Sequence, residues 1–147
     1  MKNFSLFWLI AGLFSIVSAG TTSCNAPQNQ AFEMDKAFTL HYGETAQWTA
    51  DETIQIRFDS ILDDSRCPKG VQCVWAGRAV AGITFSQNGE MQNGALVLGD
   101  PAGTNYSNTA TFGDFTVTLN QVNPHPVAEQ KIQPNDYSVE LEIKKTE

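Results

Sequence analysis

Two cysteines separated by five residues are the first side chains in this sequence whose spacing could support chemistry. Cys67 and Cys73 stand in a segment rich in turn residues, with Pro68 and Gly70 between them. A thioredoxin-type redox pair has only two intervening residues, and a structural zinc site needs four ligands. The sequence therefore predicts a structural disulfide between Cys67 and Cys73, which closes a small ring and stabilises the fold by about 2–3 kcal/mol.

Charged side chains stand just before the first cysteine, at Asp63, Asp64 and Arg66. A guanidinium group forms paired hydrogen bonds with a carboxylate, so we expect Arg66 to bind Asp64 or a backbone carbonyl and to fix the shape of the loop. A second hypothesis is that Asp59, Asp63 and Asp64 bind calcium together with backbone oxygens, which are the ligands that calcium prefers. The segment does not have the spacing of an EF-hand.

The sequence offers no arrangement typical of an active site. It contains no Gly-x-Ser-x-Gly motif, and no histidine is placed to activate a serine. We therefore predict a protein that is not an enzyme and has no cofactor. The remaining enzymatic alternative is a pocket that contains Asp63, Asp64 and Arg66.

Trp75 and Trp48 are the candidate binding aromatics. A tryptophan beside a disulfide usually packs into the core of a β-sandwich, so we expect Trp75 to be buried. Trp48 lies between Gln47 and Thr49 and suits the core or the surface equally. An exposed cluster of Trp48 with Tyr106 or Phe112 would indicate a binding surface for a sugar or a peptide.

The N-terminus has the pattern of a signal peptide. Lys2 precedes a nearly unbroken apolar run over residues 4–19, which is shorter than the roughly 20 residues that span a bilayer. Two processing sites compete. The sequence Thr-Thr-Ser-Cys at 21–24 resembles a bacterial lipobox, with Thr21 where leucine is usual and Ser23 where alanine or glycine is usual. The small residues at 17–19 suit ordinary cleavage after Ala19.

The number of cysteines favours lipid attachment. If Cys67 pairs with Cys73, Cys24 is the one cysteine left over, and a leftover cysteine in an exported protein needs a role. We predict a lipoprotein signal peptide over residues 1–23, lipidation of Cys24, attachment to a membrane and a place in the bacterial cell envelope. The alternative is a secreted soluble protein in which Cys24 is free or links two chains.

Alternation of apolar and polar residues predicts strands at 54–58, 79–85, 115–119 and 137–143. Weaker candidates are 38–42, 46–49, 71–75, 95–98 and 109–112, with turns at 42–44, 87–90 and 92–94. Strands without helices predict an antiparallel β-sandwich over residues 36–147, Greek-key and immunoglobulin-like, with seven to nine strands. A small β-barrel is the alternative. The connection at 123–136 is expected to cross between sheets, and 24–35 is expected to be a polar tether.

The cysteine segment resembles a known motif. The run Asp-Ser-Arg-Cys-Pro at 64–68, followed by Val-x-Cys-Val-Trp-Ala-Gly at 71–77, is similar to a motif of small exported bacterial proteins and lipoproteins of unassigned function. The later pattern of Leu119, Asn123-Pro124, Asp136-Tyr137 and Leu141 is similar to theirs as well. The resemblance implies an exported β-domain with this disulfide, and it implies no activity.

Charge and composition restrict the partners. The chain has 147 residues, enough for one domain, and a formal charge of −7 without a cluster of lysine or arginine. Such a surface repels nucleic acid. We therefore expect a membrane-tethered, non-enzymatic domain that binds an unknown protein or glycan partner or assists envelope assembly. The alternative is a dedicated carbohydrate- or peptide-binding module.

Overall fold

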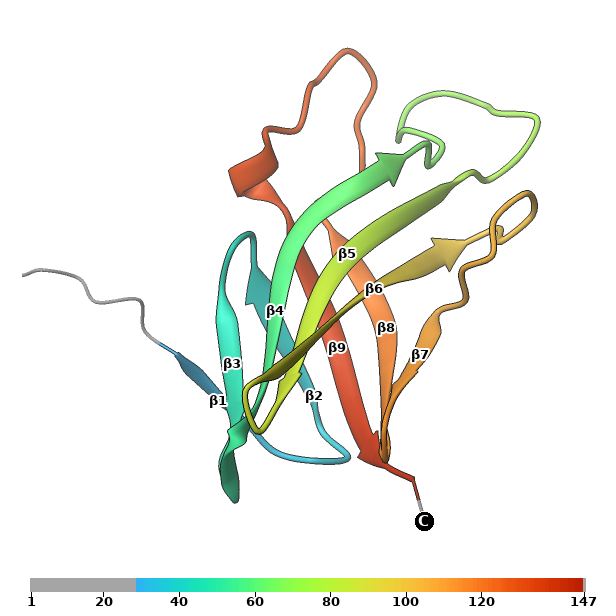
Figure 1. The fold of residues 1–147 in the computed structure, drawn as a ribbon. Helices are drawn as coiled ribbons and strands as arrows, with labels where there is room; N and C mark the ends of the chain where they lie inside the picture. Colours follow the sequence, from blue (N-terminus) through green and yellow to red (C-terminus); the bar gives the residue numbers. More distant parts are fainter. Residues whose placement is uncertain (1–28, 147) are drawn as a thin grey trace, which may run out of the picture.

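The computed structural model describes residues 29–146 and shows two β-sheets packed face to face (Figure 1). One sheet has five strands in the order β1-β3-β4-β5-β6, and the other has four in the order β2-β9-β8-β7. The predicted all-β sandwich of seven to nine strands is confirmed. The strands are β1 (Gln30–Phe32), β2 (Ala37–His41), β3 (Thr45–Trp48), β4 (Asp51–Asp64), β5 (Arg78–Gln87), β6 (Glu90–Gly99), β7 (Thr109–Phe112), β8 (Phe115–Asn123) and β9 (Ser138–Lys145).

The core lies between the two sheets and follows the alternation in the sequence. Phe85 packs between Phe112 and Phe115, with ring centroids 5.1 and 5.6 Å away. Burial of each such side chain stabilises the fold by roughly 1.5–3 kcal/mol. Of the inward residues of the four strongly predicted strands, Tyr137 is partly buried and the others are all buried, namely Ile54, Ile56, Phe58, Ala79, Ala81, Ile83, Phe85, Phe115, Val117, Leu119, Val139, Leu141 and Ile143.

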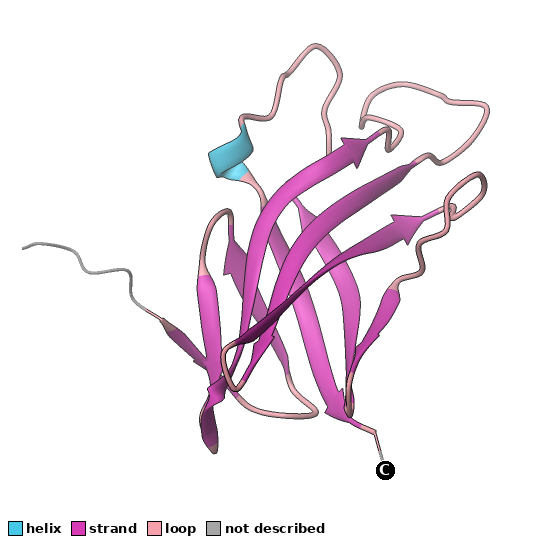
Figure 2. Cartoon of the chain, viewed as in Figure 1, coloured by secondary structure: helices cyan, strands magenta, loops and turns pink. Residues whose placement is uncertain are grey.

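The connection from β8 to β9 stays within one sheet. The two strands are hydrogen-bonded neighbours in which Asn123 lies opposite Ser138. The expectation that residues 123–136 cross between sheets was therefore wrong, because the length of this segment reflects an excursion at the end of a hairpin. In the described part of the chain, this excursion contains the only helical segment, the short 3-10 turn η1 (Pro134–Asp136), which Figure 2 shows.

The turn predicted at 92–94 is absent, because these residues lie within strand β6. Gly94 pairs with Ile83 in the ladder, and a Cβ atom at Gly94 would lie 2.6 Å from Cζ of Phe112. Glycine is required here for packing rather than for turning. The turn predicted at 87–90 is present, with Asn88 and Gly89 at φ angles of 52° and 83°.

The folded domain begins before residue 36. Residues Gln30–Phe32 pair in parallel with β3, and Phe32 is buried and stacked on Phe38 at a centroid distance of 4.8 Å. The tether prediction for 24–35 was wrong over this strand, because one phenylalanine in a polar run is a weak signal.

The predicted signal peptide at 1–23 and Cys24 lie outside the described residues. From residue 29 to residue 146, no helix is long and apolar enough to cross a membrane.

Candidate functional site

The cysteine loop, residues 65–77, joins β4 to β5 at one end of the sandwich. Figure 1 shows this loop near the connections β6–β7 and β8–β9, opposite the end where β9 finishes. At its base, the amide of Ser65 donates to the carbonyl of Arg78 (2.8 Å), and the amide of Cys67 donates to the carbonyl of Ala76 (2.9 Å). The Cys67–Cys73 disulfide is present, which confirms that prediction. The loop contains no strand, so the prediction of a strand at 71–75 was wrong.

Arg66 is the buried residue of the cysteine loop, with only 8% of its surface exposed. Its Nε and Nη2 atoms donate to the two carboxylate oxygens of Asp64 at 2.8 and 2.7 Å. Its Nη1 donates to the carbonyl of Val122, and Nη2 also donates to that of Pro124 at 2.9 Å. Both predicted kinds of partner, the carboxylate and a backbone carbonyl, are found, and they fasten the cysteine loop to the β8–β9 connection.

Tyr137 completes this cluster, and the sequence reasoning did not identify it. Its hydroxyl donates to Oδ2 of Asp64 at 3.0 Å. The alternation placed Tyr137 correctly against the core, immediately before β9, but its partner Asp64 is 73 positions away in sequence. A tyrosine at the first inward position of a strand, where its hydroxyl can reach the rim of the core, is the signal that was available.

The protonation states of the cluster follow from its geometry. Burial by itself would raise the pKa of Asp64, but the hydrogen bonds and charge of Arg66, with the bond from Tyr137, lower it below its ordinary value. Burial, together with the bond to the Asp64 carboxylate, raises the pKa of Tyr137 to about 12. Asp64 therefore stays ionised and Tyr137 stays neutral at physiological pH.

A second set of contacts fixes the middle of the cysteine loop. The amide of Lys69 donates to the carbonyl of Pro126 at 2.9 Å, and the amide of Ala128 donates to the carbonyl of Lys69 at 3.1 Å. Nε2 of His125 lies 2.9 Å from the carbonyl oxygen of Cys67, at hydrogen-bond distance. The β8–β9 connection therefore supports the first half of the cysteine loop, at Cys67 and Lys69.

Trp75 points away from the core, and the prediction that it is buried was wrong. Its exposed fraction is 76%, and that of neighbouring Val74 is 94%. The buried side chain of the cysteine loop is Arg66 rather than Trp75. Gly77 keeps the returning strand close to the outgoing one, since its φ angle is +70° and a Cβ atom would lie 1.8 Å from the carbonyl oxygen of Ser65.

A depression of about 260 Å³ lies beside Trp75 and is lined by Ser65, Trp75, Gly77, Arg78 and Asp100. Arg78 is held in place because Nη1 donates to the carbonyl of Ala102 (2.6 Å) and Nε donates to Oδ2 of Asp63 (3.3 Å). Oδ1 of Asp100 accepts from the amide of Ala102 at 2.9 Å. Sequence reasoning missed Arg78 and Asp100, because they come from β5 and from the β6–β7 connection.

The three carboxylates of the calcium hypothesis do not converge. Asp64 pairs with Arg66 and Asp63 with Arg78, while Asp59 accepts from the hydroxyl of Thr84 at 2.7 Å. Over the described range, no group of three or more histidine, cysteine, aspartate or glutamate residues could hold a metal ion. The structure therefore gives this hypothesis no support.

Trp48 belongs to the sandwich rather than to a binding cluster. It is half-buried and packs edge-on against Phe115 at a centroid distance of 6.4 Å. Phe112 is buried, while Tyr106 is 44% exposed and lines a different depression with Pro101. The cluster of Trp48 with Tyr106 or Phe112 that would have indicated a binding surface is not formed.

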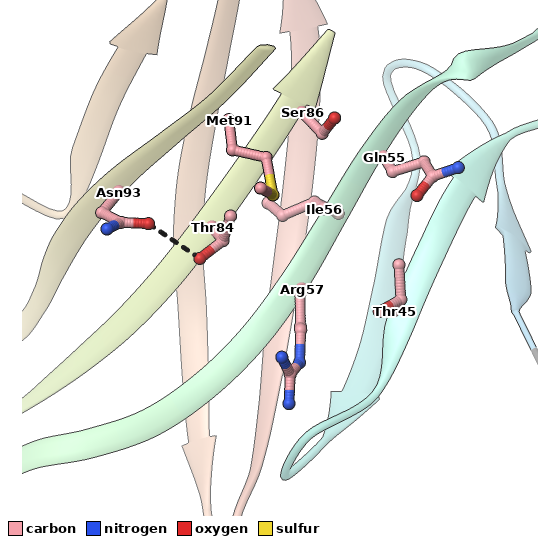
Figure 3. Close-up of a pocket in the computed structure, with 8 residues that line it drawn as sticks. All are labelled: Thr45, Gln55, Ile56, Arg57, Thr84, Ser86, Met91 and Asn93. Carbon is pink, nitrogen blue, oxygen red and sulfur yellow. Dashed lines mark hydrogen bonds between the residues drawn. The ribbon is translucent and has the colours of Figure 1, made fainter. Parts of the chain in front are cut away.

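A separate groove of about 340 Å³ crosses the outer face of the five-stranded sheet (Figure 3). Its lining is mostly polar, and Oγ1 of Thr84 lies at hydrogen-bond distance, 3.0 Å, from the side-chain amide of Asn93. The one large apolar side chain exposed there is Met91, and no aromatic ring lines the groove. This groove lacks the flat apolar platform that Trp75 provides at the loop end.

Comparisons with protein-family models, curated proteins and solved structures found no match to this chain. The resemblance of the cysteine motif to exported bacterial proteins therefore stays a prediction.

The Asp64 cluster predicts a specific pH dependence of stability. A lowered pKa in the folded state means that Asp64 stabilises the protein above the unfolded pKa of about 3.9 and loses this effect as the pH falls through the folded value. We expect the gap in unfolding free energy between the native protein and Asp64→Asn to shrink below about pH 4. Tyr137 has a raised pKa, so the gap to Tyr137→Phe should shrink as the pH rises above about 10.

Urea unfolding at a series of pH values measures both gaps. Equal gaps at every pH would contradict the protonation states assigned to Asp64 and Tyr137.

Proposed function

We propose that this chain is an exported, lipid-anchored binding domain without enzymatic activity, which presents the cysteine loop to a ligand in the cell envelope. The observation that carries the proposal is Trp75, 76% exposed on a loop that the disulfide and the buried side chain of Arg66 hold in place. A solvent-exposed indole adds little to the stability of the fold. An indole on an ordered loop suits binding, because little backbone conformational entropy is lost when the loop contacts a ligand.

Export and anchoring are supported by separate features. A disulfide is expected in an oxidising compartment. The pairing of Cys67 with Cys73 leaves Cys24 as the unmatched cysteine, next to a lipobox-like sequence. Strand β1 begins at Gln30, so at about 3.3–3.6 Å per residue the segment from Cys24 spans about 20 Å at most. An anchor at Cys24 would therefore keep the domain close to the membrane surface.

Two features support a binding role over an enzymatic one. The side chains of Asp64 and Arg66 are 8% and 7% exposed and bind one another, which leaves little of either side chain for contact with a substrate. Among residues 29–146, the side chains of His41 and His125 form no hydrogen bond with a hydroxyl or a carboxylate. A histidine paired with a nucleophilic hydroxyl or with an orienting carboxylate is therefore not assembled in this part of the chain.

Anchoring is tested by the mass of the mature N-terminus. We expect the mature protein to begin at Cys24 and to carry the added mass of acyl chains on that residue, as the lipobox-like sequence implies. Mass spectrometry of the protein from the producing bacterium makes the measurement. A mature chain that begins at Gly20 with an unmodified Cys24 would contradict the anchor and leave a secreted protein.

Binding is tested by Trp75→Ala. We expect this change to weaken binding to envelope fragments by about tenfold or more, as truncation of a central aromatic residue does at interfaces, without lowering the unfolding temperature. The native protein in detergent micelles is co-sedimented with detergent-washed envelope fragments, so that the lipid does not contribute. Met91→Ala is the matched control, because Met91 is nearly as exposed as Trp75 (75% against 76%) but lies in the separate groove on the five-stranded sheet. Equal binding by Trp75→Ala and the native protein would overturn the proposal.

A further inference from the structure

We propose that the depression beside Trp75 binds one ring of a neutral carbohydrate through a pair of adjacent hydroxyl groups. This inference rests on the proposed function and names the ligand of the same site. Its basis is the set of groups that the fold brings together there, namely an exposed indole, a fixed guanidinium and a carboxylate with a free oxygen.

The indole supplies the platform. The C–H face of a sugar ring is apolar and packs on the face of an aromatic ring, which is why tryptophan suits this ligand. Trp75 lines the depression, and its exposure leaves the ring open to solvent. The volume of about 260 Å³ is just below the usual range of pockets for drug-sized ligands. One ring of a longer glycan fits this size, with the rest of the chain outside.

Arg78 and Asp100 supply complementary hydrogen bonds. Arg78 uses Nε and Nη1 to bind Asp63 and Ala102, and its Nη2 bonds to no other described residue. Asp100 uses Oδ1 to bind Ala102, and its Oδ2 accepts no bond from the described residues. A free donor and a free acceptor thus line the same depression. Two adjacent hydroxyls match them, because each hydroxyl both donates and accepts.

The charge of the site favours a neutral ligand. Asp63 and Asp100 carry two negative charges around the single positive charge of Arg78, and the whole chain has a formal charge of −7. An acidic sugar or a phosphate would be repelled by this surplus. A neutral hexose carries no charge, so this negative surplus does not repel it.

The closing experiment is binding of the full-length protein in detergent micelles to an array of neutral and acidic glycans, followed by titration of the best neutral glycan. We expect binding to neutral glycans with adjacent free hydroxyls, weakened about tenfold or more by Trp75→Ala and by Asp100→Asn. Met91→Ala should bind like the native protein. Periodate cleaves the bond between adjacent hydroxyl-bearing carbons, so the same glycan after periodate oxidation should no longer bind.

The outcomes separate this inference from the proposed function. Failure to bind any neutral glycan on the array overturns the carbohydrate assignment, and so does binding that survives periodate oxidation. If Trp75-dependent binding to envelope fragments persists in that case and is destroyed by protease treatment of the fragments, the proposed function stands and the ligand is a protein. If Trp75 affects neither kind of binding, both proposals fail.

Discussion

The buried ion pair of Arg66 with Asp64 is the interaction on which the loop end of this protein depends. Removing two charges from water costs several kcal/mol per ion, and the cost is offset only when the pair is well aligned and fully hydrogen-bonded. Here the carboxylate accepts from the guanidinium and from Tyr137, and the guanidinium also binds two backbone carbonyls. Among the described residues, no buried side-chain nitrogen or oxygen lacks a partner. Loss of either charge would leave the other unpaired, at a cost of about 3–5 kcal/mol.

This pair links the junction of β4 and the cysteine loop to a segment more than 50 residues later in the sequence. Asp64 ends β4, Arg66 is the second residue of the cysteine loop, and Val122 and Pro124 belong to the end of β8 and the connection after it. The disulfide restricts the tip of the same loop, and backbone hydrogen bonds restrict its base. Trp75 is thereby placed in solvent on a support that is already ordered, which is the condition under which an exposed aromatic ring binds a ligand with little loss of entropy.

Local patterns predicted the strands and the pairing of charges, and they failed where partners are remote. Alternation identified the inner faces of β4, β5, β8 and β9, because one face of each strand packs on the core. The closeness of Asp64 and Arg66 in sequence was enough to predict their bond. The prediction for Trp75 was wrong because a disulfide next to it does not reveal which side chain of the loop is buried, and here that side chain is Arg66. The bond of Tyr137 to Asp64 and the pocket residues Arg78 and Asp100 depend on loops brought together by the fold.

Amide hydrogen exchange in Arg66→Lys tests the central claim most directly, because lysine keeps the charge but cannot form the fork of hydrogen bonds. The amides of Cys67 and Lys69 report on the loop, and that of Ile83 in β5 reports on the core. If Arg66 holds the loop in shape, the two loop amides exchange about tenfold faster or more in the variant, while Ile83 changes far less. Loop amides with unchanged exchange rates, or an equal acceleration at all three positions, would contradict the account.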